Sequence, residues 1–436
     1  REVISVHIGQ AGIEIGKECW ELYCLEHAIN VDGSVSDTAT ADDPAFGRFF
    51  YKNESGRFIA RACFSDFEPT CIDGVKTGKY KSLFDPQYLH ASKEDSGNNF
   101  ARGYLTMGNK NINQTVAGLF KLAEACDSLQ GFMIYHSLGG GTGSGFTSVL
   151  MERLTAHFGN KSKCEIAIFP GDKISAATVE PYNAVLATHG TLTHSECSFL
   201  FDNEAVFDIC TNKLGIERPG YPQINKVVAQ VMSSITASLR FEGSLNANLT
   251  DFRTNLVPNP RLRFPLVNFA PFASAQTTPS GQMSVTDMTN ACFDTSNAMV
   301  KCNPLQGKYM ACCMTYRGNA KQSDINAVIE TVKQNQNIQF FDWIPKDIQV
   351  WSNHRKPTML PESDMAKLVT SVCALSNTTA MAPVWTKLRK RFDMMYSRRA
   401  FIHWYKSEGV LQDQFDSARE DLVTLEKDYE NVSSAV

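Results

Sequence analysis

The most chemically suggestive feature of the sequence is a run of glycines at residues 139–145. The run reads Gly-Gly-Gly-Thr-Gly-Ser-Gly, and five glycines in seven residues are costly in ordinary secondary structure. A strand-like apolar segment, residues 132–135, precedes it, and a helical pattern containing Phe146, Val149 and Leu150 follows. Glycines at such a junction let the backbone approach an anion, while the helix N-terminus supplies positive potential. The sequence therefore predicts a phosphate-binding loop rather than a merely flexible turn.

Two common nucleotide-binding motifs do not fit this loop. Counted from Gly139, position 144 is Ser where the dinucleotide motif G-x-G-x-x-G requires glycine. No Gly-Lys pair in the chain is followed by Ser or Thr, as a P-loop requires. Dinucleotide dehydrogenases and P-loop NTPases are therefore disfavoured.

The elements that position the loop follow a repeated pattern. Residues 3–8 form a strand-like run, residues 9–12 follow as a turn, and residues 13–25 are expected to form a helix. The same strand, turn and helix recur around residue 139. This repetition predicts a doubly wound, Rossmann-like parallel sheet within the first 200 residues, an α/β architecture.

Three apolar stripes predict further long helices. Spacings of three and four residues place apolar side chains on one helical face at Ile224, Val228, Val231 and Ile235, at Trp385, Leu388, Phe392 and Met395, and at Phe415, Ala418, Leu422, Leu425 and Tyr429. Residues 250–350 are richer in Pro, Asn and short β-prone runs, such as 264–267 and 309–312. That change of composition predicts a second domain of mixed α+β structure.

Length and composition limit the class of protein. The chain has 436 residues, 43% of them apolar, and exceeds the roughly 250 to 300 residues at which single cores stop growing, so two or three domains are expected. Its net charge of −4 does not favour nucleic acid as a partner. There is no run of about 18 apolar residues and no signal-peptide pattern at the start. We expect a soluble, intracellular protein without a membrane partner.

The cysteines and histidines form no recognisable metal site. The 13 cysteines are scattered without a CxxC pair, and the nine histidines include no HExxH pattern. No set of Cys and His has the spacing of zinc ligands. Buried thiols and no structural metal are expected.

Charge is concentrated near the end of the sequence. Residues 411–436 hold seven acidic residues against two basic ones, a net charge of −5, and the apolar stripe of this helix predicts that the acids face water. Such a face is either ordinary solvated surface or a docking surface for a cationic partner, and the sequence leaves both open. The preceding helix carries Lys387, Arg389, Lys390 and Arg391 on its predicted outer face, which is more typical of a surface helix than of a nucleic-acid patch.

The glycine run resembles the signature motif of the tubulin family, to which the bacterial division GTPases are more distantly related. Other segments of the sequence match the family in the same order, at residues 9–12, 20–24, 179–183, 202–205, 254–258 and 399–405. Within the family, the chain is similar to α-tubulins rather than β-tubulins. Residues 358–365 resemble extra loop length that α-tubulins carry, and Asp251 stands where α-tubulins have an acid and β-tubulins a lysine.

The resemblance implies GTP and Mg²⁺ as cofactors. The nucleotide-binding positions that it implies are Gly9, Gln10, Ala11, Glu14, Ser96, Asn98, Ser137, Gly140, Gly141, Thr142, Gly143, Ala176, Glu180, Asn203, Tyr221 and Asn225. Glu180, Asn203, Tyr221 and Asn225 would meet the ribose and guanine, and Glu68 would lie near the magnesium ion, with Asp66 and Asp95 in neighbouring loops. Three of these positions depart from the usual α-tubulin residue: Glu14, Ser96 and Ala176.

The resemblance also implies a domain plan, the tubulin fold. Residues 1–203 would form the GTP-binding domain, and 204–241 a connecting loop and central helix. Residues 242–380 would form the intermediate domain, and 381–436 antiparallel C-terminal helices.

As an α-tubulin-like subunit of microtubules, the chain would hold a non-exchangeable GTP and pair with β-tubulin in a heterodimer that polymerises head to tail. Asp251, one methylene shorter than the usual glutamate, would be the catalytic residue that helps activate the water attacking GTP on the adjacent β subunit. Lateral contacts would be made to a neighbouring α-tubulin, through an altered loop at residues 270–282. Motor and microtubule-associated proteins would bind the acidic C-terminal helix, and the location would be the cytoplasm and its cytoskeleton.

Two other functions are conceivable for a protein with this scaffold. A metabolic nucleotide enzyme on the same scaffold would need its own acid, base or nucleophile, and the sequence shows no His/Asp/Ser or Cys/His constellation outside the nucleotide loops. A self-polymerising GTP hydrolase, similar to the division GTPases, stays open as the alternative.

Overall fold

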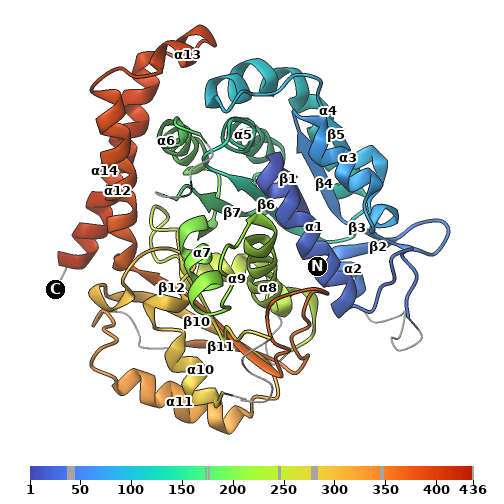
Figure 1. Ribbon diagram of the computed structural model, residues 1–436, viewed down its shortest axis with the longest axis vertical. Helices are drawn as coiled ribbons and strands as arrows, with labels where there is room; N and C mark the ends of the chain where they lie inside the picture. The colour runs from blue at the N-terminus through green and yellow to red at the C-terminus, as the bar shows by residue number, and fades with distance from the viewer. Residues whose placement is uncertain are drawn as a thin grey trace.

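The computed structural model describes residues 1–36, 45–171, 174, 177–243, 247–275, 283–343 and 348–434. Its amino-terminal part is built around a six-stranded sheet in which all neighbouring strands are parallel (Figure 1). In spatial order the strands are β5 (Leu89–Ala91), β4 (Ala62–Asp66), β1 (Glu2–Ile8), β6 (Leu129–Ser137), β7 (Ser162–Phe169) and β8 (Cys197–Asp202). The strand order reverses between β1 and β6, which confirms the predicted doubly wound sheet.

Helices cover both faces of this sheet. On one face Val3 belongs to the core formed with α1 (Gly9–Glu26) and α3 (Pro69–Thr77). On the other face, its neighbour Ile4 belongs to the core formed with α4 (Met107–Glu124) and α5 (Thr147–His157). Because both faces are buried, the strands are apolar along most of their length instead of alternating with polar residues.

A long central helix joins the parallel sheet to a second sheet. After α6 (Glu180–Thr191) and α7 (Asn203–Asn212), helix α8 (Tyr221–Arg240) is buried continuously over residues 227–240 and packs against α1 and the second sheet. The second sheet has the order β11 (Gln349–Asn353), β10 (Tyr309–Gly318), β12 (Thr370–Thr378) and β9 (Leu266–Ala270). Only the β10–β11 pair within it is parallel, so the predicted mixed domain is confirmed.

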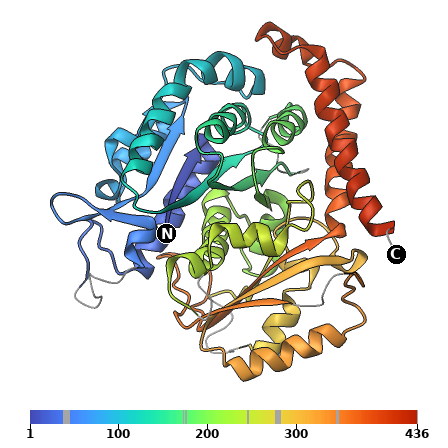
Figure 2. The same ribbon diagram turned by 180° about the vertical axis from the view of Figure 1, so that it is seen from behind.

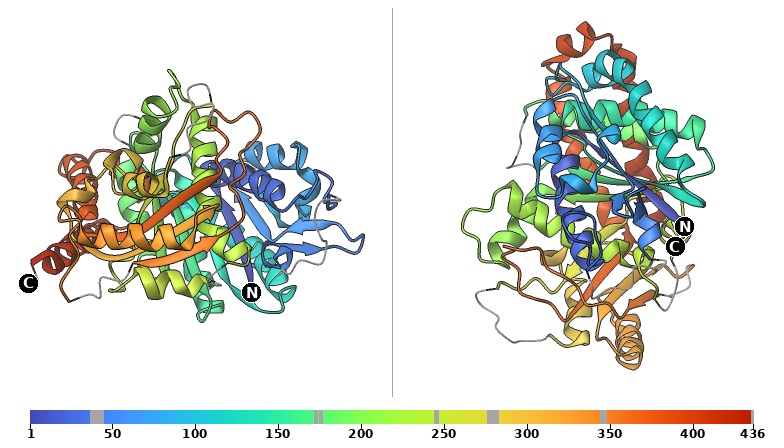
Figure 3. Two further views of the ribbon diagram at one scale, coloured as in Figure 1. Left: turned by 90° about the horizontal axis from the view of Figure 1, so that it is seen from below. Right: turned by 90° about the vertical axis from the view of Figure 1, so that its right-hand side faces the viewer.

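Shorter elements complete these two parts. A hairpin of β2 (Phe50–Lys52) and β3 (Phe58–Ala60) follows α2 (Phe46–Phe49). Helix α9 (Leu249–Leu256) lies between the two sheets and contacts strands of both. Helices α10 (Val285–Ala291) and α11 (Gln322–Gln334) pack on each other beside the second sheet, at the lower end of the molecule in Figure 1 and in the right panel of Figure 3.

The C-terminal helices form one flank of the molecule (Figure 2). Helix α12 (Ala382–Tyr396) and helix α14 (Gln412–Ser434) pack against each other and against α6, with the short α13 (Ile402–Ser407) between them in sequence. The predicted stripe of α14 is buried at all five positions, and the stripe of α12 at Trp385, Leu388 and Phe392. The stripe of α8 is buried as well. These helix predictions are confirmed.

The prediction that the acids of α14 face water is only partly right. Glu426 is 7% exposed and accepts hydrogen bonds from Arg389 and Thr386 on α12. Asp421 lies 2.6 Å from His189, and Asp428 pairs with Arg261 at 2.7 Å. Part of the acidic charge of this helix is therefore matched inside the chain, and Arg389 does not belong to an exposed basic face. Spacing alone could not predict this because α12 and α14 place their charges opposite each other.

A buried ion cluster ties the central helix to α1 and to the second sheet. The Glu26 carboxylate, at the end of α1, lies 2.7 Å from Arg240 of α8 and 2.7 Å from Arg317 of β10. Ser233 donates to the same carboxylate at 2.8 Å. Burial alone would raise the pKa of Glu26, but the two guanidinium groups hold it below its usual value. Removing a cationic partner would leave buried negative charge uncompensated and lower the free energy of unfolding.

Two further expectations concern cysteines and membranes. All 13 cysteines lie in the described part of the chain as free thiols, 12 of them buried and Cys126 half-buried, as the scattered pattern predicts. Across the described residues, no helix combines the length and the apolar character needed to cross a membrane.

Candidate functional site

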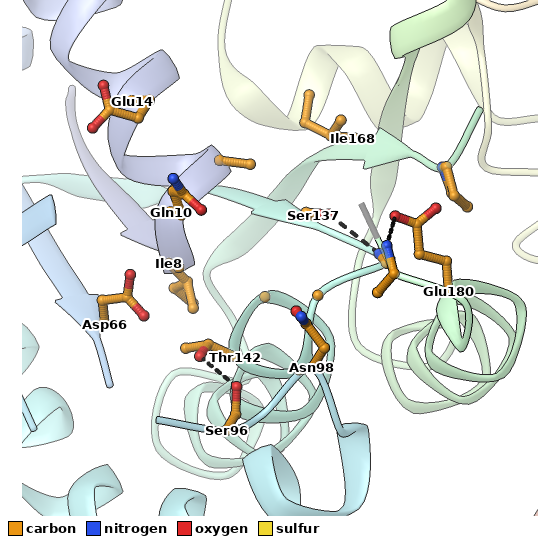
Figure 4. A pocket seen from close by; sticks show the side chains of 18 of the residues that line it. Ile8, Gln10, Glu14, Asp66, Ser96, Asn98, Ser137, Thr142, Ile168 and Glu180 are labelled. Carbon is orange, nitrogen blue, oxygen red and sulfur yellow. Dashed lines mark hydrogen bonds between the residues drawn. The ribbon is translucent and has the colours of Figure 1, made fainter. Parts of the chain in front are cut away.

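A pocket of about 330 Å³ opens at the carboxyl ends of the parallel strands (Figure 4). In doubly wound sheets this edge, next to the point where the strand order reverses, is where ligands bind. The pocket collects residues from the ends of β1, β4, β6 and β7, from the segment after β5, and from the first turns of α7 and α8. Segments that are distant in sequence therefore converge on one cavity.

The structure brings the sequence-predicted residues together. All of the nucleotide-binding candidates that it describes line this pocket, namely Gly9, Gln10, Ala11, Glu14, Ser96, Asn98, Ser137, Gly140, Gly141, Thr142, Gly143, Glu180, Asn203, Tyr221 and Asn225. The metal candidate Glu68 lines it too, as do Asp66 and Asp95. Ala176 lies outside the described residues. Contact with a nucleotide stays a prediction for each of them.

The first wall of the pocket is the junction of β1 and α1. The sequence predicts a turn at residues 9–12, but helix α1 begins at Gly9 itself, so that prediction is wrong. Gly9 turns the chain alone because it adopts a φ of +68°, a left-handed conformation that suits glycine. No described side chain caps the helix at Ile8, and the first N–H groups of a helix have no partner within it. These groups, at Gln10 and Ala11, are available to an anion in the pocket.

The glycine run forms the second wall, and its glycines serve two purposes. A Cβ at Gly140 would meet no atom within 4 Å, so the space beside this residue is open and belongs to the pocket. A Cβ at Gly143 would come within 2.6 Å of the Ser137 carbonyl oxygen, and one at Gly145 within 2.3 Å of the Phe100 carbonyl oxygen. The sequence suggested that the glycines let an anion approach. The structure shows that most of them are also needed because other backbone segments pack closely against the run.

The second half of the glycine run lies in a π-helical turn, Thr142–Phe146, which leads into α5. Such wide turns occur often at functional sites. The Thr142 hydroxyl lies 3.0 Å from the Ser96 hydroxyl (Figure 4). Ser96, one of the positions that departs from the α-tubulin pattern, therefore links the segment after β5 to the glycine loop.

Asn183, on α6, holds the two loops in place. Its amide nitrogen donates to the carbonyl oxygens of Asn98 and Gly139, both at 2.7 Å. Its amide oxygen accepts from the Phe100 N–H at 3.1 Å and from the Tyr405 hydroxyl at 2.6 Å. The side chain is fully buried, and three of its four hydrogen bonds are to backbone groups of the two loops. This role was not predicted, although Asn183 falls in a segment that matches the family, because one Asn in a helix gives no signal of its partners.

Carboxylates occupy one side of the pocket. Burial raises the pKa of Asp66 to about 6, and the nearby charges of Asp95 and Glu68 add to the rise, against hydrogen bonds from the backbone of Phe67 and Glu68. Glu68 is exposed and accepts a hydrogen bond from Thr70. Among the described residues, no group of three or more His, Cys, Asp or Glu side chains could hold a metal alone. One or two carboxylates suffice for Mg²⁺ when phosphates supply other ligands.

The opposite side is suited to a sugar and a base. Glu180 accepts a hydrogen bond from the Ala177 N–H at 3.2 Å. Asn203 begins α7, which Asp202 caps by accepting from the Glu204 N–H at 2.8 Å. Tyr221 is 51% exposed and can offer a ring face for stacking. The pocket thus combines amide, carboxylate and aromatic groups.

Asp251 lies far from this pocket. It sits in the first turn of α9, where its carboxylate accepts from the Asn248 N–H at 2.7 Å, and Asn248 in turn accepts from Gln130 at 2.9 Å. Gln130 is near the start of β6 and Ser137 at its end, so about 23 Å of extended chain separate them. The acid and the pocket therefore belong to opposite edges of the parallel sheet.

Comparison with known families agrees with this arrangement. A model described as Tubulin/FtsZ family, GTPase domain, matches residues 2–211, the part that contains the parallel sheet and the glycine loop. A second model, described as Tubulin C-terminal domain, matches residues 260–390. The chain belongs to the tubulin family. Its fold is the tubulin fold, and it is a GTP-binding protein of that family. Both matches are to the family as a whole and do not separate its α and β branches.

Proposed function

We propose that this chain is an α-tubulin-like structural subunit of microtubules that holds GTP in the pocket between β1 and β6. The observation that carries the proposal is the convergence of the glycine loop, the start of α1 and the polar residues of α7 and α8 on one cavity. The phosphates would lie against Gln10, Ala11 and residues 140–143, where backbone N–H groups and helix N-termini favour negative charge. The guanosine would lie toward Asn203, Tyr221 and Asn225.

A magnesium ion fits the carboxylate side. Glu68 would hold it, with Asp66 and Asp95 close by. The ion neutralises phosphate charge when bound. Buried and repelled by its neighbours, Asp66 would gain from a cation more than an exposed carboxylate does.

The position of Asp251 supports hydrolysis between subunits. About 23 Å of β6 lies between this acid and its own chain's pocket, so it cannot serve that pocket. In a head-to-tail polymer the amino edge of one sheet faces the carboxyl edge of the next, and Asp251 would then face the nucleotide of β-tubulin. Its carboxylate Oδ2 caps α9 through the Asn248 N–H, and this contact fixes its orientation. The shorter side chain would make hydrolysis slower than with glutamate, because small misplacements are costly.

Assembly with β-tubulin and GTP tests the proposal. Light scattering should rise only when both chains and GTP are present. A chain that polymerises alone would instead support the alternative, a self-polymerising GTP hydrolase similar to the division GTPases. A chain that does neither would leave the subunit proposal without support.

Phosphate release from the assembled polymer tests Asp251. Asp251→Asn removes the carboxylate charge but keeps an oxygen that can accept from the Asn248 N–H, so it is a better control than alanine, whose lost cap costs about 1 kcal/mol. We expect Asp251→Asn to nearly abolish hydrolysis of β-bound GTP and Asp251→Glu to raise it. An Asn variant that hydrolyses at the parent rate would remove Asp251 from the mechanism.

Motor and microtubule-associated proteins would bind the acidic helix α14, and a neighbouring α-tubulin would bind laterally. Part of the lateral loop, residues 276–282, lies outside the described residues. The cytoplasmic cytoskeleton is the location that such a subunit would have.

A further inference from the structure

A buried histidine lies directly behind the glycine loop. His136, the penultimate residue of β6, is 0% exposed. Its Nδ1 is 2.8 Å from the carbonyl oxygen of Gly143, a residue of the pocket wall. Its Nε2 is 2.8 Å from Oε1 of Glu165 on β7, which is 2% exposed. Both ring nitrogens therefore face oxygen atoms that accept hydrogen bonds.

This geometry requires one proton between His136 and Gly143 and another between His136 and Glu165. A neutral imidazole has one donor and one acceptor nitrogen, and beside an ionised carboxylate it would leave one nitrogen lone pair against an oxygen lone pair at 2.8 Å. The Glu165 carboxylate also accepts from the Ser198 hydroxyl at 2.6 Å. Although burial raises the pKa of Glu165, hydrogen bonds from His136 and Ser198 and the charge of His136 hold it below its usual value. The Ser198 hydroxyl stabilises charge on the carboxylate, which places the shared proton on the ring and makes the pair a doubly protonated imidazole beside a carboxylate.

The adjacent strand provides a contrast. His7, in register with Tyr135 of β6, has its Nδ1 3.1 Å from the Gly12 carbonyl oxygen, but its Nε2 accepts from the Trp20 indole N–H at 3.0 Å. One nitrogen donates and the other accepts, so His7 is neutral, and burial lowers its pKa to about 3. Each histidine contacts the backbone of one pocket wall, His7 at Gly12 and His136 at Gly143. The ring of His7 is neutral, whereas that of His136 carries a second proton.

We propose that His136 is a positioning residue, an imidazolium that holds the glycine loop by donating to Gly143 and strengthens phosphate binding from behind the loop. The inference rests on the proposed nucleotide-binding function. The positive and negative charges of the pair do not have equal effects at the glycine loop. The imidazolium of His136 contacts Gly143, whereas the Glu165 carboxylate lies on the neighbouring strand β7, farther from the loop. The positive end of the pair faces the phosphates, in a buried setting where charge is weakly screened.

Other groups around the pair act on the carboxylate. Cys197 of β8 and Arg263, from the segment before β9, both interact electrostatically with Glu165. Thr191 of α6 adds a hydrogen bond to it. Tyr135 points to the other face of the sheet, where it stacks on His7 at 4.6 Å. The ring of His136 thus has Gly143 and Glu165 as its polar contacts.

Glu165→Gln is the cleanest perturbation because it keeps the shape of the side chain and its hydrogen bonds with His136 and Ser198. Its amide nitrogen can donate to Nε2 of His136, its oxygen can accept from Ser198, and His136 becomes neutral while still donating to Gly143. Only the charges are removed. We expect the affinity of the variant for nucleotide to fall on the order of tenfold, as for other residues that orient ligating groups. Its thermal unfolding temperature should stay close to that of the parent.

The protonation state is measured directly by ¹⁵N NMR of the full chain labelled at histidine imidazole nitrogens, with His136→Gln assigning the signal. We expect two protonated nitrogens for His136 at pH 7, a neutral tautomer for His7, and a neutral His136 in Glu165→Gln. A neutral His136 in the parent overturns the proposal, and so does undiminished nucleotide affinity in Glu165→Gln. If Glu165→Gln does not fold, the parent spectrum still decides. A parent that binds no nucleotide contradicts the proposed function, whatever its spectrum shows.

Discussion

Replacing Asn183 with alanine should loosen both loops of the pocket at once. The side chain makes four hydrogen bonds, to Asn98, Gly139, Phe100 and Tyr405, and it is fully buried. At about 1 kcal/mol for each bond lost, the free energy of unfolding should fall by about 4 kcal/mol. Nucleotide release should accelerate as well, because the Gly139 and Asn98 carbonyls no longer have a common anchor.

Tyr405→Phe is the matched control. It removes one of the four bonds and leaves the Asn183 amide oxygen paired with the Phe100 N–H, so it should cost about 1 kcal/mol. Denaturant unfolding of the full chain with bound nucleotide gives both free energies, and chase with a fluorescent GTP analogue gives the release rates. If Asn183→Ala were no less stable than Tyr405→Phe and released nucleotide at the parent rate, the loops would not depend on Asn183 and the reasoning would be refuted.

Three further predictions concern pH, the buried ion cluster and the surface. Below pH 6.5, His7 becomes protonated in the unfolded chain but stays neutral in the folded protein, where its pKa is lowered to about 3. His7 should therefore contribute a loss of stability of about 1.4 kcal/mol per pH unit below pH 6.5, and the loss measured by urea unfolding between pH 6.5 and 5 should be smaller in His7→Gln by this contribution. Arg317→Met leaves Glu26 with one cationic partner and should cost about 3 to 5 kcal/mol in denaturant unfolding. Glu420→Lys, at an exposed position of α14, should slow association of a lysine-rich peptide at low salt in stopped flow; an unchanged rate would mean that this face is only solvated surface.

Periodicity predicts the parallel sheet and three of the long helices. The strand–turn–helix units around residues 9 and 139 predict the parallel sheet, because buried parallel strands are apolar on both faces. The stripes of α8, α12 and α14 predict which faces pack inward. The start of α1 was missed, since the pattern does not reveal that Gly9 alone can turn the chain at a φ of +68°.

Contacts across the fold were beyond the sequence. Glu426 is an ordinary surface acid by its spacing, and only the packing of α14 on α12 places it against Arg389. Asn183 and His136 give no local signal, because their partners come from other strands and loops. The resemblance to tubulins placed the pocket residues better than spacing could, since their convergence depends on strand order.

The nucleotide content of the purified chain tests the central claim most directly, with one glycine variant as a steric probe. A methyl group at Gly140 would meet no protein atom within 4 Å, so Gly140→Ala should fold normally while occupying the space proposed for phosphate. Gly47→Ala, which is equally open but outside the pocket, is the control. After acid extraction, the parent and Gly47→Ala should each yield about one GTP per chain, and Gly140→Ala much less. A folded parent that yields no guanine nucleotide, or a Gly140→Ala variant that retains it fully, would contradict the account.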